Sequence, residues 1–158
     1  MATKEDLLAA LAPIVDALNG ISLDDPAGTK RMLDEKFPVD GPIVSKARTL
    51  FREGVAAGWL CDRENSGVKF SRVLKAADAT KWSIDAVHMS GPGAGHLHPG
   101  GEVDLCFAVE GSPKFDGHEG AWVVFGKNTW HVPTVEGGVM DILYFLPGGA
   151  ITFGPKPA

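Results

Sequence analysis

The hydrophobic periodicity of the chain changes near residue 60, and this change limits the fold more than any other feature of the sequence. Before it, apolar residues recur three and four positions apart, as on one face of a helix: Leu7, Leu8, Leu11, Ile14, Val15 and Leu18. After residue 65, apolar and polar residues alternate, which is the pattern of half-buried strands. The sequence therefore predicts a helical N-terminal layer followed by a region of β-structure.

Local signals at the ends of the helical segments support this division. Thr3 and Asp6 have the spacing of a capping box, and Asp25 precedes Pro26 as an N-cap precedes a proline in the first helical turn. The apolar stripes and the stop signals that follow them predict three helices, at about 3–20, 25–37 and 40–58.

The second part of the chain predicts at least five short strands with no helix between them. The alternating runs lie at 68–75, 84–88, 102–109, 121–125 and 139–146, separated by turns that contain glycine or proline. Such a series favours an antiparallel barrel or sandwich. A chain of 158 residues has room for one good core and not for two large domains. We expect a single α+β domain that is mainly β, with residues 1–60 forming a helical layer on a barrel at residues 65–158.

Charge and composition exclude several classes of partner. The net charge of -5 disfavours nucleic acid and anionic membranes. No apolar run approaches the ~20 residues of a membrane helix, and the first residues lack the pattern of a secretory signal. Cys61 and Cys106 are too few for a disulfide framework. We expect a cytoplasmic protein with reduced thiols that binds neither nucleic acid nor membrane.

The residues with metal-binding chemistry begin at a His-x-His pair. His96 and His98 are one residue apart, and on a strand they point to the same side. After a Pro-Gly-Gly turn, Glu102 can return a carboxylate beside them. Two imidazoles and a carboxylate suit divalent Fe, Mn, Ni, Co or Zn. A His-x-His pair alone is more often a surface or structural feature, so the prediction depends on a second stretch, in which Asn128 precedes His131 in a turn between strands.

These two stretches resemble the paired signature motifs of the cupin superfamily. The resemblance implies a jelly-roll barrel in which one metal ion is bound by four side chains, those of His96, His98, Glu102 and His131. Some positions depart from the pattern. The glycine that closes the first motif is Gly111, two residues later than the motif spacing from Glu102 predicts. If the spacing is counted back from Gly111, the carboxylate of the motif is Asp104 instead of Glu102. Either carboxylate can be the ligand and the other a general acid or base. A cupin barrel that binds no metal is the alternative.

Over nearly its full length the chain resembles a narrower family, the 4-hydroxylaminobenzoate lyases of bacterial nitrobenzoate breakdown. The likeness rests on the helical first 60 residues and on the stretches 96–107 and 128–133. Family members convert 4-hydroxylaminobenzoate to 3,4-dihydroxybenzoate and ammonia. Water is added and ammonia lost, so the balance requires neither NAD nor flavin, and the sequence has no dinucleotide fingerprint. The resemblance implies a metal-assisted lyase in which Asp104 and Glu102 are the candidate catalytic residues.

An aromatic carboxylate substrate would need a cation and apolar walls. Arg72 alternates with apolar residues on one side of its strand and is our candidate for the carboxylate, a surface arginine being the alternative. Trp130 and Phe107 are candidates to wall the ring, with core packing as the alternative, and His88 is a candidate to line the pocket, with a place in the barrel wall as the alternative.

Two other functional classes fit the same motifs. One is a metal-dependent cupin dioxygenase or isomerase that acts on another small aromatic or carboxylic acid. The other is a cupin that binds a small ligand without turnover. Cupin relatives often form homodimers, and the N-terminal helices can either cover one barrel opening or form a subunit interface.

Overall fold

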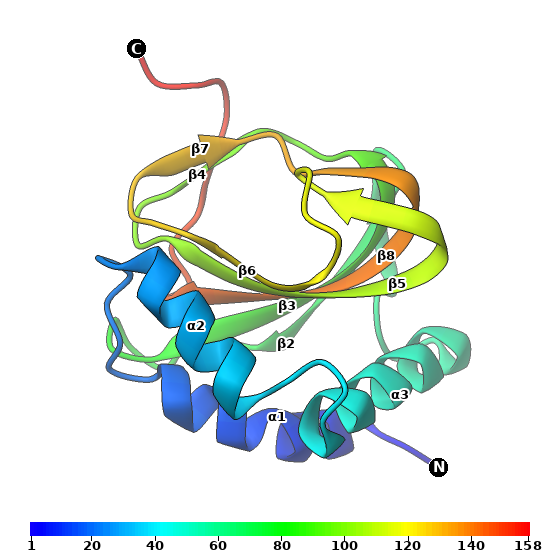
Figure 1. Ribbon diagram of the computed structural model, residues 1–158. Helices are drawn as coiled ribbons and strands as arrows, with labels where there is room; N and C mark the ends of the chain where they lie inside the picture. Colours follow the sequence, from blue (N-terminus) through cyan, green and yellow to red (C-terminus); the bar gives the residue numbers. More distant parts are fainter.

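The computed structural model describes residues 1–158 and places three helices on one face of a large antiparallel sheet (Figure 1). The helices are α1 (Lys4–Leu18), α2 (Pro26–Lys36) and α3 (Pro42–Ala57). The strands are β1 (Arg63–Asn65), β2 (Val68–Leu74), β3 (Trp82–Pro92), β4 (His96–His98), β5 (Glu102–Phe115), β6 (Ala121–Phe125), β7 (Thr129–His131), β8 (Thr134–Pro147) and β9 (Thr152–Phe153).

The three predicted helices are confirmed, and so are their end signals. The Thr3 side chain accepts a hydrogen bond from the backbone N–H of Asp6, and the Asp6 side chain accepts one from the backbone N–H of Thr3, which completes the capping box. Asp25 caps α2 ahead of Pro26. Helix α3 ends at Gly58, whose φ of 85° is left-handed and suits a residue without a side chain.

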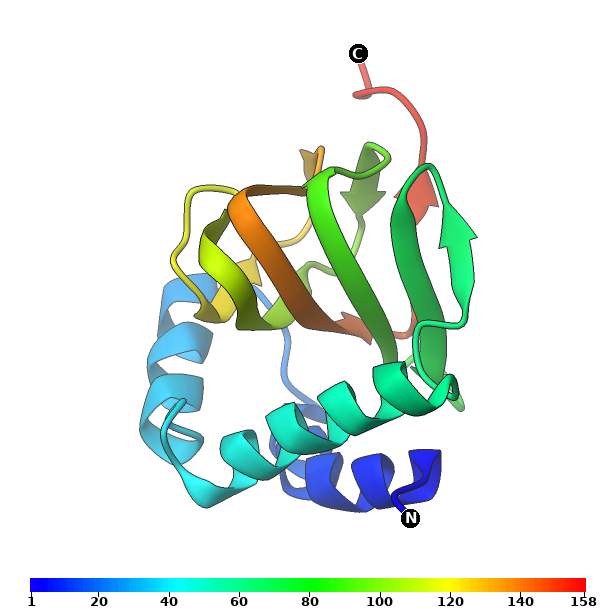
Figure 2. The same ribbon diagram turned by 90° about the vertical axis from the view of Figure 1, so that its right-hand side faces the viewer.

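The strands form two antiparallel sheets of a cupin-type jelly roll, which confirms the predicted fold class. The large sheet has the order β1-β2-β3-β8-β5-β6, and the small one has the order β7-β4-β9. The large sheet curves around the interior, and the small sheet lies across from it (Figure 2). Strands β5 and β8 run beyond the predicted ends because their pairing continues through register shifts after Ala108 and Gly111, where the apolar alternation is lost.

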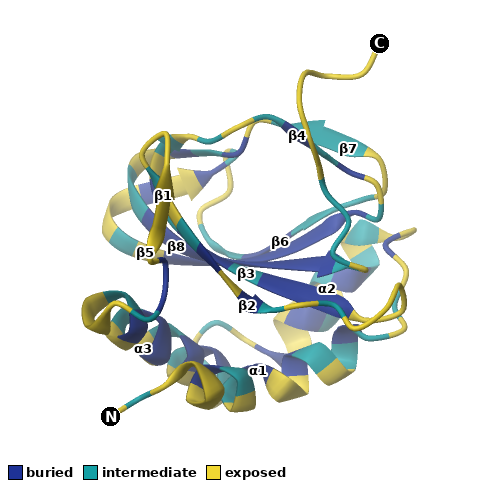
Figure 3. Ribbon diagram, turned by 180° about the vertical axis from the view of Figure 1, so that it is seen from behind, coloured by how far each residue is buried: buried dark blue, intermediate teal, exposed yellow.

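The two faces of the large sheet have different neighbours, because side chains alternate along each strand. One face packs on the helices and forms the main apolar core, in which Trp122 donates a 2.9 Å hydrogen bond from Nε1 to the Phe37 carbonyl beside α2. The other face lines the barrel interior. Figure 3 shows that the buried residues of the helices lie on the sides facing the sheet. None of the helices combines the length and the apolar character that a membrane span requires.

Candidate metal centre

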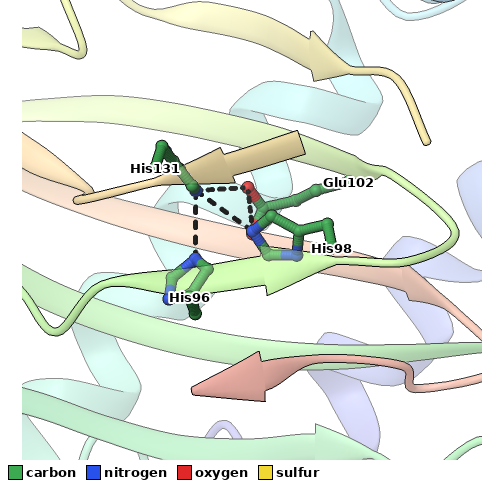
Figure 4. A group of neighbouring side chains, drawn as sticks. All are labelled: His96, His98, Glu102 and His131. Carbon is green, nitrogen blue, oxygen red and sulfur yellow. Dashed lines mark hydrogen bonds and ion pairs between the residues drawn. The ribbon is translucent and has the colours of Figure 1, made fainter. Parts of the chain in front are cut away.

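Strands β4, β5 and β7 bring four predicted ligand residues together inside the barrel (Figure 4). One ligand atom from each residue lies within 4.8 Å of the others, and the four residues are His96, His98, Glu102 and His131. The first three are buried, and the His131 side chain is 11% exposed. Residues 33 and 35 positions apart in the chain thus converge on one point.

Short-range features of the backbone set this geometry. Alternation in β4 turns His96 and His98 to one side, and the register of β4 with β7 places His96 opposite His131. Gly101 returns the chain toward β5 with φ of 85°, at a point where a Cβ would lie 2.6 Å from the Phe125 carbonyl oxygen. Asn128 adopts a left-handed φ of 61°, and its N–H donates to the His98 carbonyl at 2.8 Å.

The side chains fit a divalent cation. The Nε2 atom of His131 lies 3.0 Å from the Nε2 atoms of both His96 and His98, and Glu102 Oε2 lies 3.2 Å from Nε2 of His98. Ligand atoms about 2.0–2.2 Å from a shared ion lie about 3 Å apart at neighbouring positions. Both buried oxygens of Glu102 lack a hydrogen-bond partner. A buried carboxylate without donors is costly, and a bound cation would compensate for that cost.

Asp116, which the sequence analysis missed, orients His131. Its Oδ2 lies 2.5 Å from Nδ1 of His131, and its Oδ1 accepts from the Thr134 N–H at 2.8 Å. A carboxylate on the far nitrogen of an imidazole holds the other nitrogen toward a metal. The residues Asp116-Gly117 signal a turn, but no spacing in the sequence connects that turn to His131.

The charges in the cluster are strongly coupled. Burial lowers the pKa of His131, but the hydrogen bond with Asp116 and the negative charges of Glu102 and Asp116 outweigh burial and raise it to about 9. Burial and the neighbouring His98 lower the pKa of His96 to about 4. Burial alone would raise the pKa of Glu102, yet contacts with His131 and His98 hold it below its usual range.

The two carboxylates that the sequence could not separate occupy different places. Glu102 lies among the three histidines, whereas Asp104 follows on the same side of β5 and is not in that group. Asp104 is fully buried, and neither of its carboxyl oxygens has a hydrogen-bond partner. Burial and the negative charge of Glu102 raise the pKa of Asp104 well above its usual range. The geometry thus separates Glu102, which lies within reach of a shared cation, from Asp104, which lies beside that group.

A cavity of about 640 Å³ opens beside His96. His96 forms part of the cavity wall, and Arg72 and Asp85 line the cavity from neighbouring strands. The Arg72 side chain is about half exposed and forms an ion pair with Asp85 through Nε. Tyr144, from β8, also lines the cavity; neither it nor Asp85 was identified from the sequence, where both lie in ordinary strand patterns.

The predicted contact of Phe107 with a substrate is wrong. The centroid of its ring lies 6.4 Å from that of Phe51 in α3, on the face of the sheet that the helices cover. Phe107 is five positions from Glu102, so alternation places the two side chains on opposite faces. The odd spacing between Glu102 and Phe107 could already have placed Phe107 outside the cavity from the sequence alone.

His88 and Trp130 also lie away from the cavity, contrary to prediction. His88 faces α3, where its Nδ1 is 2.7 Å from Asp141 Oδ1 and 3.3 Å from the Arg52 guanidinium. Trp130 alternates with His131, so its ring points outward, and its Nε1 donates to the Gly154 carbonyl at 3.0 Å. Both residues have structural partners instead of a place in the cavity wall.

Comparisons with known proteins give the same family in two ways. A family model described as "PnbB: 4-hydroxylaminobenzoate lyase" matches residues 9–153. A 4-hydroxylaminobenzoate lyase from Nocardioides sp. (strain LMS-CY) is 25% identical, with 99% of this chain and 98% of the relative covered. A 4-hydroxylaminobenzoate lyase from Pseudomonas putida is 29% identical, with 80% of this chain and 83% of the relative covered.

A solved structure resembles the whole fold. The DMSP lyase DddQ from Ruegeria pomeroyi DSS-3 aligns with 98% of both chains at a TM-score of 0.58 and 18% identity. At that identity the likeness concerns the fold. The family model, by contrast, spans most of the sequence, including both stretches that carry the candidate ligands. This chain belongs to the 4-hydroxylaminobenzoate lyase family.

Proposed function

We propose that this protein is a metal-assisted lyase that converts 4-hydroxylaminobenzoate to 3,4-dihydroxybenzoate and ammonia. The proposal rests on one observation above all: in a chain of this family, three histidines and a glutamate converge on one point, and one of them, His96, lines a cavity of about 640 Å³. A cavity of that size is in the range of small-molecule sites.

His96, His98, Glu102 and His131 would hold the metal ion. When bound, a divalent ion supplies Lewis-acid chemistry, which favours departure of an oxygen leaving group and ionisation of water. Histidine and carboxylate donors accept Fe, Mn, Zn, Ni or Co. Asp116 keeps His131 in the orientation that this role needs.

The reaction needs proton transfer but no external oxidant. One water is added and one ammonia leaves, and reduction at the N–O bond offsets oxidation of the ring. A proton must reach the departing oxygen, and another must leave the attacking water. Asp104 is our candidate for both transfers because it lies beside Glu102 with both carboxyl oxygens free of hydrogen bonds. General acid–base catalysis of this kind contributes about 10²–10⁴-fold.

Arg72 is our candidate for the substrate carboxylate. It lines the cavity, and its ion pair with Asp85 uses Nε alone, which leaves both Nη groups without a hydrogen-bond partner in the chain. Two parallel N–H donors match the two oxygens of a carboxylate. Asp85 on its other side would hold the guanidinium in place.

The test couples metal analysis of the purified protein to an assay for ammonia release from 4-hydroxylaminobenzoate. We expect stoichiometric metal and turnover in the wild type, and loss of both in His98→Ala. His118→Ala is the matched control, since His118 is exposed and lies outside the cluster. Turnover that survives in a fully chelated preparation would show that the metal role is wrong. Oxygen consumption without ammonia release would favour a dioxygenase instead.

A further inference from the structure

The segment that follows β8 runs along the small sheet and reaches the cavity. Strand β9 pairs with β4, so that Phe153 lies opposite His96, and the Gly154 N–H donates to the Gly95 carbonyl at 3.1 Å. Figure 2 shows β7, β4 and β9 as short strands side by side. Phe153 thus lies beside the candidate metal-binding cluster, although it is far from His96 along the chain.

Phe153 contacts this cluster through its ring. The centroid of the ring lies 5.4 Å from that of the His96 imidazole, and the interplanar angle of 83° makes this an edge-on contact. Phe153 lines the same cavity as Arg72. Phe153 is nevertheless 65% exposed and belongs to no buried apolar cluster of the protein. A large apolar side chain that adds nothing to the core, yet faces a cavity beside candidate ligands, has the character of a binding residue.

Trp130 and Gly95 hold this segment in place. The Trp130 Nε1–H donates to the Gly154 carbonyl at 3.0 Å, next to Phe153. Gly95 leaves room for the indole, because a Cβ there would come within 2.8 Å of the Trp130 ring. The tryptophan that the sequence suggested as a cavity wall thus supports the backbone that carries a different aromatic residue to the cavity.

We propose that Phe153 binds the aromatic ring of the substrate next to His96 and that Trp130 positions Phe153 through the Gly154 carbonyl. This inference rests on the proposed function for the aromatic carboxylate nature of the substrate. Arg72 and Phe153 line one cavity with His96, so the same cavity offers a cation for a carboxylate and an aromatic side chain for a ring. An aromatic contact of this kind changes binding by up to about tenfold.

The first experiment measures binding of 4-aminobenzoate, an analogue without the N–O bond, by calorimetry on the metal-loaded protein, together with KM and kcat for 4-hydroxylaminobenzoate. Phe153→Ala should weaken analogue binding and raise KM by roughly tenfold. Phe153→Leu should fall between it and the wild type, and metal content should not change. Thr152→Ala is the matched control, because its exposed side chain lies on the same strand but does not line the cavity.

The second experiment tests the positioning role. Trp130→Phe keeps an aromatic ring but removes the donor to Gly154, and it should weaken 4-aminobenzoate binding less than Phe153→Ala does. In the Phe153→Ala background, the same change should cause no further loss, since a residue that acts through Phe153 has nothing left to position. An equal loss in both backgrounds would show that Trp130 does not act through Phe153.

The outcomes separate this inference from the proposed function. If the wild type neither binds 4-aminobenzoate nor releases ammonia, the proposed function is wrong and the inference fails with it. If the wild type does both and Phe153→Ala matches it, only the inference is overturned. A variant that loses metal while keeping its KM would also overturn the inference, because Phe153 would then support the metal centre and not the substrate.

Discussion

Replacing Asp116 by Asn tests whether the four-residue cluster is built to hold a metal ion. Asp116 bridges two groups, with Oδ2 at 2.5 Å from Nδ1 of His131 and Oδ1 accepting from the Thr134 N–H. Asparagine has one oxygen and one NH₂ group, so it can serve only one of these partners as an acceptor. If the oxygen stays with Thr134, the amide donates to Nδ1 of His131, which moves the imidazole proton to Nε2, the nitrogen that faces the other ligands.

The size of the effect follows from this loss of orientation. Removing a carboxylate partner from a metal-binding histidine typically costs about 10–100-fold in metal affinity, or about 1.4–2.7 kcal/mol. The backbone should not change, because Asp116 has a φ of 47° and asparagine tolerates the left-handed region well. The expected loss therefore reflects the side chain alone.

The assay is competition for the metal ion against a chromophoric chelator, with ammonia release measured on the same samples. Glu119→Gln is the control, since it removes one negative charge from the same turn at an exposed position. We expect Asp116→Asn to lose metal affinity and Glu119→Gln to keep it. Equal affinity in the wild type and Asp116→Asn would refute the orienting role, and equal losses in the two variants would assign the effect to net charge.

Three further predictions address the cavity, the core and a buried thiol. Arg72→Lys keeps the charge but loses the paired donors, so KM for 4-hydroxylaminobenzoate should rise roughly tenfold; an unchanged KM would mean that the carboxylate binds elsewhere. Phe107→Ala should lower the free energy of unfolding in urea by about 3–5 kcal/mol and leave KM unchanged, because the ring is buried under the helices. Burial raises the pKa of the Cys61 thiol from 9.0 to about 12. Between these two values the unfolded chain loses the thiol proton and the folded chain keeps it. The contribution of this thiol to stability is therefore complete below pH 9 and is lost as the pH rises through about 12. The decline in unfolding free energy over that interval should be shallower in Cys61→Ala, and a parallel decline would contradict this account.

Several parts of the fold and site could be predicted because their signals are local. A helix or strand imposes its period on residues that are neighbours in the chain, so the change near residue 60 separated the helical layer from the sheets. The His-x-His pair and the turn before Glu102 could be predicted for the same reason, because each depends on residues that are close together in the chain. The turn at Asn128 was also visible, because asparagine is one of the residue types that favour turns.

The residues that were misplaced or missed depend on contacts between distant segments. Which face of the large sheet meets the helices decides that His88 packs under α3. Asp116 reaches His131 only because the turn between β5 and β6 lies against the end of β7 and the start of β8. Strand β9 has two residues, too few to show a period, and exists through its pairing with β4.

The sequence by itself determined the kinds of elements, their order and the chemistry of the candidate ligand side chains, since these follow from residue type and spacing along the chain. The tertiary structure alone decided which carboxylate joins the histidines, what steadies His131 and which aromatic ring borders the cavity. Those outcomes depend on pairing between strands far apart in the chain, and sequence spacing carries no information about which side chains such pairing brings into contact.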